Sequence, residues 1–322
     1  MAVAVEPDVA GSEPAGIGPS EAQPSRDVSA AGRSRLAPIT PRRIGLVAAA
    51  WLLITVVGVG LVVYGMGPML EERDQRDLLS DYRAEIEKAA NEAFGLPGVQ
   101  EVTEAPGVGD PVAIVEVNAI DFRQVVVEGV GPQQTRRGPG HVPGTAGPGQ
   151  PGNSAIVGRK SGFGGQFSQL DELGRGDEIV VITTQGRSLY KVTRVGQRHV
   201  PRGDEEVFGP SEDDRLTLVT SSSVMPWATN PATVVVAKLD TVAFHPTPQG
   251  GRTSDQDGRD SDGSALAPVF LAVLGYACAA AAAVLLYRRT RPRSAYLMSA
   301  PLLVVATVLV AEASARLLPA WF

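Results

Sequence analysis

The stretch best suited to chemistry is Leu216–Ser223, LTLVTSSS, in which a short apolar strand runs directly into three serines. A serine hydroxyl is a poor nucleophile unless a neighbouring base takes its proton. The chain's three histidines are scattered and show no metal-ligand spacing. Its single cysteine, Cys278, lies inside an apolar run, so we expect neither a disulfide nor a soluble catalytic thiol. We predict no metal and no cofactor, and the chemistry of this strand end depends on what surrounds Ser221.

The same serines have a structural interpretation. Ser221, Ser222 and Ser223 can form a turn held by local side chain to backbone hydrogen bonds, which we favour over a hydroxyl cluster that binds a peptide. Trp227 lies in the following loop, where an exposed indole would anchor a peptide and a packed one would not. Ser222, Ser223 and Trp227, together with His141, define a candidate groove at the end of the strand.

Composition limits the classes of partner. The formal net charge is −6 and no large basic block is present, so nucleic acid is not a natural partner. The 322 residues are enough for one domain of about 150 residues together with membrane segments and tails.

Around the serine stretch, short β-branched runs alternate with turn residues. The runs are 113–120, 124–129, 154–158, 178–184, 188–195, 216–220 and 233–239. Only 166–173 has a helical pattern among them. Short spacing with one short helix predicts a mainly β domain, a closed or nearly closed antiparallel barrel over 111–243.

Three uncharged segments flank this domain and predict transmembrane helices. Arg42 and Arg43 precede the first, and four arginines between 288 and 293 follow the second, so both flanks are expected in the cytoplasm. A cleaved signal peptide is the alternative for the first segment, and a re-entrant or interfacial helix for the third. The pattern predicts a multi-pass membrane protein with the N-terminus inside and the barrel outside.

The predicted organisation divides the chain into nine parts. They are a disordered cytoplasmic tail (1–43), a signal anchor (44–66), a helical stalk and linker (67–110), the barrel (111–243), a linker (244–264), a transmembrane helix (265–287), a cytoplasmic arginine loop (288–294), a transmembrane helix (295–313) and a tail (314–322).

Four motifs in order resemble the sortase domain, particularly class E-like sortases of actinobacteria. They are VVVEGV (125–130), GPGHVPGTAGPGQPGNSAIVG (138–158), GGQFSQLDELGRGDEIVV (164–181) and LTLVTS (216–221). The resemblance implies a sortase-like closed β-barrel and a cell-surface cysteine transpeptidase. In that family a cysteine attacks an L-P-x-T-G-like sorting signal, with a histidine as acid and an arginine that stabilises the oxyanion.

Carried over residue by residue, the resemblance places three other residues at those positions. Ser221 stands where the cysteine follows T-L-x-T, Arg159 where the histidine follows the glycine, and Ala232 where the arginine opens the last core strand. Arginine cannot act as a base at accessible pH. A pair of charged residues such as Arg159-Lys160 most often lies in a solvated loop, and we expect the same here.

Three functions follow as expectations. The favoured one is a catalytically degenerate sortase domain that has lost transpeptidase activity and binds or scaffolds sorting-signal-like peptides or other cell-surface proteins. The alternative is a transpeptidase or hydrolase that uses Ser221 with an unusual base such as His141. In the third, the membrane spans are the working part and the barrel orients an assembly.

Overall fold

The computed structural model describes residues 41–95, 104–201, 203–225, 231–251, 266–289, 292–315 and 317–318. The predicted disordered tail falls almost wholly outside the described residues, as do Trp227 and linker residues 252–264.

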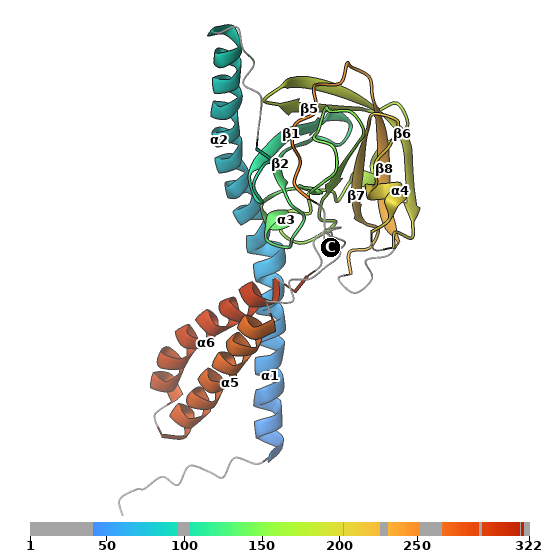
Figure 1. Cartoon of the computed structure of the whole chain (residues 1–322). Coiled ribbons are helices and arrows are strands. Elements are labelled where there is room, and N and C mark those ends of the chain that lie inside the picture. Colours follow the sequence, from blue (N-terminus) through green and yellow to red (C-terminus); the bar gives the residue numbers. More distant parts are fainter. Residues whose placement is uncertain are drawn as a thin grey trace, which may run out of the picture. The chain divides into compact units, whose positions relative to one another are not determined.

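The centre of the fold is a closed barrel of eight strands (Figure 1). The strands are β1 (Pro111–Val117), β2 (Phe122–Glu128), β3 (Gly140–His141), β4 (Asn153–Val157), β5 (Glu178–Thr183), β6 (Gly186–Arg198), β7 (Arg215–Ser221) and β8 (Ala232–Leu239). Around the barrel they are ordered β1-β2-β3-β4-β7-β8-β6-β5. The predicted closed, mainly β architecture is confirmed.

The prediction of a purely antiparallel barrel is wrong. β2 pairs with β3 in parallel, and β4 pairs with β7 in parallel. A parallel pair needs a long crossover connection. Between β4 and β7 the chain supplies one, because it first builds the β5–β6 hairpin. The β-branched runs encode extended backbone but not the direction of the neighbouring strand.

β7 is buried on both faces, which explains why its sequence shows an apolar run with little polar alternation. Leu216 and Leu218 belong to the main hydrophobic core inside the barrel. Val219 faces a second cluster, which includes Val157 of β4 and Ala232 of β8. The strand end that carries Ser221 is therefore fixed from both sides.

The helix expected over 166–173 is reduced to one 3-10 turn, η3 (Leu170–Glu172). The ring of Phe167 lies so close to the backbone of Gly158 that a Cβ there would be 2.4 Å from it. Phe167 and Leu170 both enter the core, and the backbone between them forms i→i+3 turns. Burying both side chains favours tight turns over a regular helix in this segment.

Other short elements interrupt the barrel connections. They are η2 (Asn118–Ile120), α3 (Gln134–Arg137) and α4 (Glu205–Phe208). α4 lies over the second cluster, to which it contributes Val207 and Phe208.

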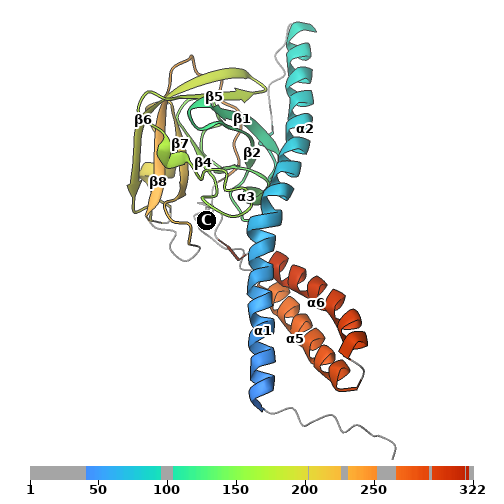
Figure 2. The same cartoon turned by 180° about the vertical axis from the view of Figure 1, so that it is seen from behind.

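A long helix covers the start of the predicted helical stalk, precedes the barrel and packs on it. α1 (Pro41–Gly60) continues through a π-helical stretch, η1 (Leu61–Met66), into α2 (Gly67–Gly95). Leu78 and Tyr82 of α2 are buried against Val125 of β2 and its neighbours. Figures 1 and 2, which view the molecule from opposite sides, show α2 running along β1 and β2.

Three described helices are long and apolar enough to cross a membrane: the continuous helix from Leu52, α5 (Leu266–Arg289) and α6 (Pro292–Ala315). Ala279 and Ala283 of α5 are buried against Leu303 and Ala306 of α6. Small residues let two helix backbones approach closely in a membrane, as the alanine-rich face of α5 predicts.

We expect Gln75→Ala to loosen the contact between α2 and the barrel. The Gln75 amide accepts from Val125 N at 2.7 Å and donates to the carbonyls of Val125 (3.1 Å) and Arg137 (2.7 Å). Leaving these partly buried backbone groups unpaired costs about 2–4 kcal/mol of the free energy of unfolding. Hydrogen exchange should show faster exchange of the Val125 amide, and the exposed Glu87→Ala on the same helix should leave it unchanged.

Candidate functional site

Three adjacent strands bring the three sequence-predicted positions to one end of the barrel wall. Ser221 ends β7 and its Cα pairs directly with Ala232, the first residue of β8. On the other side, Val157 of β4 pairs in parallel with Val219, and Gly158 N donates to Val219 O at 3.0 Å. Arg159 and Ser221 each lie two residues beyond that pair. Ser221 and Ala232 are therefore direct neighbours, and Arg159 follows the end of the neighbouring strand β4.

The hydroxyl of Ser221 is bonded within its own turn. It donates to Ser223 O at 2.9 Å and accepts from Ser223 N at 3.1 Å. Ser222 Oγ donates to the carbonyl of Pro231. The local side chain to backbone bonds predicted for the serine turn are present. A carbonyl oxygen cannot take a proton at neutral pH, so this bonding leaves Ser221 unactivated.

Arg159 is fully buried, so its expected place in a solvated loop is wrong. Its Nε donates to Thr135 O at 3.1 Å and its Nη2 to Pro132 O at 3.0 Å, while its backbone N donates to Gln166 Oε1. These bonds join β4 to the segment around α3. A buried guanidinium persists because several acceptors surround it.

Burial, followed by the nearby charge of Arg136, lowers the pKa of Arg159 to about 9. The guanidinium is therefore charged at neutral pH, where it can neither accept a proton nor replace a histidine as a base.

Phe163 covers this guanidinium. The Arg159 Cζ lies 5.2 Å from the Phe163 ring centroid, and the Arg136 Cζ lies 4.9 Å from it. Both distances are within the range of cation–π attraction. Phe163 has φ +42°, a left-handed conformation that costs a non-glycine residue energy, and its ring also packs on Val63. The loop 162–165 thus closes over the position where the resemblance expects the base.

His141 is held as a structural residue, although we considered it as a base. Its Nδ1 lies 2.7 Å from Glu128 Oε2, and its Nε2 lies 2.9 Å from Ala146 O. Thr145 Oγ1 is 3.0 Å from the same Nε2, but its proton goes to Val142 O. Both ring nitrogens are therefore engaged, and Nε2 carries a hydrogen.

His199 lies two strands away from Ser221. It follows Arg198, which pairs with Ala232, so two strand spacings of about 5 Å each separate its backbone from that of Ser221. Its side chain is exposed and Ser221 is buried, so the two are not in contact.

Among the described residues, no group of three or more His, Cys, Asp or Glu is placed to hold a metal ion.

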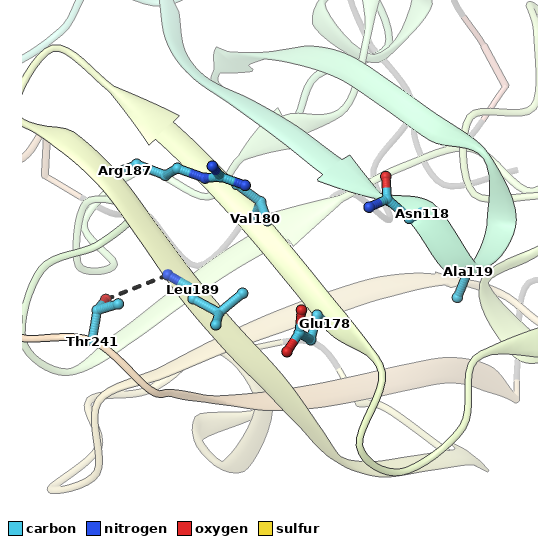
Figure 3. A pocket seen from close by; sticks show the side chains of 7 residues that line it. All are labelled: Asn118, Ala119, Glu178, Val180, Arg187, Leu189 and Thr241. Carbon is cyan, nitrogen blue, oxygen red and sulfur yellow. Dashed lines mark hydrogen bonds between the residues drawn. The ribbon is translucent and has the colours of Figure 1, made fainter.

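Figure 3 shows a surface depression of about 410 Å³ on the β5–β6 hairpin. Glu178 and Arg187 both line it, and Thr241 Oγ1 accepts from Leu189 N at 3.3 Å. Leu239 pairs with Tyr190, whereas Ala232 pairs with Arg198. The depression is therefore at the opposite end of the strands from Ser221.

Sequence reasoning missed several residues that shape this end of the barrel: Glu128, Thr135, Phe163 and Gln166. Glu128 had a usable signal, because an acidic residue that closes the apolar run VVVEG needs a partner when buried. The others act through backbone carbonyls or loop geometry, which residue types do not reveal.

Residues 115–240 match the family model described as the sortase domain, so the barrel is a sortase domain. No curated protein matches the chain.

Solved structures similar to this chain are also sortases. A sortase D5 transpeptidase of Clostridium perfringens is 21% identical, with 52% of this chain and 99% of that chain covered and a TM-score of 0.42. Sortase E of Streptomyces avermitilis is 28% identical, with 42% and 91% covered and a TM-score of 0.37. Sortase E1 of Streptomyces coelicolor, solved with a tripeptide in the active site, is 23% identical, with 44% and 94% covered and a TM-score of 0.36.

If Arg159 is a structural brace, Arg159→Ala should lower the free energy of unfolding of the barrel by about 3–5 kcal/mol, because it leaves a cavity and unpaired buried carbonyls. Lys160→Ala is the matched control. Its ammonium pairs at 2.6 Å with Asp171, whose side chain is 46% exposed while that of Lys160 is 11% exposed, and loss of this pair should cost no more than about 1 kcal/mol. Urea unfolding followed by circular dichroism measures both, and equal effects would contradict the brace.

Proposed function

We propose that this chain is a membrane-anchored, cell-surface protein whose sortase domain does not catalyse transpeptidation. The domain serves as a binding or scaffold module for sorting-signal-like peptides or for other cell-surface proteins. The observation that carries the proposal is the set of residues at the end of β4, β7 and β8: Arg159, Ser221 and Ala232.

Transpeptidation requires a nucleophile, a proton carrier and a stabiliser of the oxyanion. Ser221 offers a hydroxyl bonded to a carbonyl, and Arg159 offers a cation committed to two other carbonyls. Ala232 offers only a methyl group, and it packs in the second hydrophobic cluster. Each of the three requirements is unmet at the position where the family resemblance expects it.

The alternative, catalysis through Ser221, needs a base within hydrogen-bond reach of its hydroxyl. His141 is held by Glu128 and Ala146, and His199 is exposed two strands away. At the position where the family has its histidine, the chain has the buried Arg159, whose guanidinium lies under the Phe163 ring. These contacts support the binding function over a serine enzyme.

Three apolar helices support the membrane anchoring. The arginines at 42 and 43 and those between 288 and 293 favour a cytoplasmic location for both flanks. One span separates each of these two flanks from the barrel. The barrel therefore faces the cell exterior in this arrangement. The partners expected there are peptides or proteins of the cell surface.

The proposal is tested with the full chain in detergent, an L-P-x-T-G-type peptide and a primary amine, with products resolved by mass spectrometry. We expect no new amide product above the protein-free background, while a fluorescent version of the peptide shows saturable binding. Turnover that disappears in Ser221→Ala but persists in Ser223→Ala would overturn the absence of catalysis. Unchanged co-purification of partner proteins after deletion of the barrel would instead assign the working role to the membrane spans.

A further inference from the structure

A second pocket, of about 370 Å³, lies between α2, the segment before β1, the β3–β4 loop and the β5–β6 turn. Its walls include four carboxylates, Glu85, Glu104, Asp110 and Glu128, but no lysine or arginine among the described residues that line it. His141 is the one lining residue that can carry a positive charge. Arg137 does not line the pocket, and its Nη1 donates to the carbonyl of Gly109, the residue before Asp110, at 3.4 Å.

The innermost carboxylate is only half satisfied. Glu128 is 1% exposed, and its Oε2 pairs with His141 Nδ1 at 2.7 Å. Its Oε1 has no hydrogen-bond partner among the residues that the structure describes. A buried carboxylate oxygen without a donor is costly, so a ligand that donates to it gains free energy from satisfying it.

The rest of the lining favours an ammonium on an aliphatic stem. Thr183, Thr184 and Gln185 add neutral acceptors near the carboxylates, and the Gln150 amide is fixed by bonds to Gln185 and Thr247. Pro106, Pro111, Val112 and Pro148 provide apolar wall. The volume is within the range of small-ligand pockets.

We propose that this pocket binds a primary ammonium carried on an alkyl chain, a lysine side chain of a peptide or protein. The ammonium donates to Glu128 at the floor, and the outer carboxylates Glu85, Glu104 and Asp110 attract it. The site shares no residue with Arg159, Ser221 or Ala232, so it stands or falls independently of the proposed function.

The test uses the full chain in detergent and saturation-transfer NMR titration with Nα-acetyl-lysine N-methylamide. Nα-acetyl-norleucine N-methylamide has a similar stem without the charge, and we expect it to bind at least tenfold more weakly. Raising NaCl from 50 to 500 mM should weaken the lysine compound severalfold, because salt screens attraction to exposed carboxylates. Equal affinity of the two compounds overturns the proposal.

Variants locate the site. Glu85→Gln and Asp110→Asn are each expected to weaken binding three- to tenfold, and Glu128→Gln more than tenfold. Glu178→Gln, in the depression of Figure 3, is the control and should have no effect. If Glu128→Gln fails to fold, the two outer variants decide. Unchanged affinity in a folded variant that combines Glu85→Gln with Asp110→Asn overturns the proposal, and so does an equal loss of affinity in Glu178→Gln.

A lipid headgroup is the other source of a primary ammonium. Glycerophosphoethanolamine carries a phosphate that the carboxylates repel, so it should bind more weakly than the lysine compound. Tighter binding of glycerophosphoethanolamine would contradict the assignment to a lysine side chain.

Discussion

The ladder of β4, β7 and β8 is the constraint on which the site depends. Its parallel half ends at the pair of Val157 with Val219, two residues before Arg159 and Ser221, and its antiparallel half pairs Ser221 with Ala232. A slip of one residue would turn each side chain to the other face of the sheet. The buried clusters on both faces of β7 prevent such a slip. The fold therefore holds the three positions at one end of the barrel wall, where they carry an arginine, a serine and an alanine.

At two of these positions, the residues present have taken structural roles. Arg159 ties β4 to the segment around α3 and lies under Phe163, and Ala232 fills space in the second hydrophobic cluster. A cation held by carbonyls and an aromatic ring suits a closed wall better than an open cleft. Replacing these residues with catalytic ones would therefore disturb packing as well as add chemistry. These contacts make the three positions a fixed part of the barrel wall.

The strands could be predicted because β-branched runs and turn residues mark them locally, as in LTLVT and TVVVAKL. The parallel pairing of β4 with β7 could not, because it depends on where the β5–β6 hairpin lies. Likewise, the motifs located Ser221, Arg159 and Ala232, but not the burial of Arg159. That burial rests on the carbonyls of Pro132 and Thr135 and on the left-handed backbone of Phe163. The pairing of His141 with Glu128 also joins residues that no local pattern connects.

The central claim is that Ser221 is not a nucleophile, because its proton is donated to Ser223 O and no base replaces that bond. Labelling of the full chain with a fluorophosphonate probe, followed by peptide mass spectrometry, tests this claim most directly. The account predicts no adduct on Ser221 under conditions that fully label a known serine hydrolase. An adduct on Ser221 that forms in the native chain and is lost in Arg159→Ala or on denaturation would contradict it.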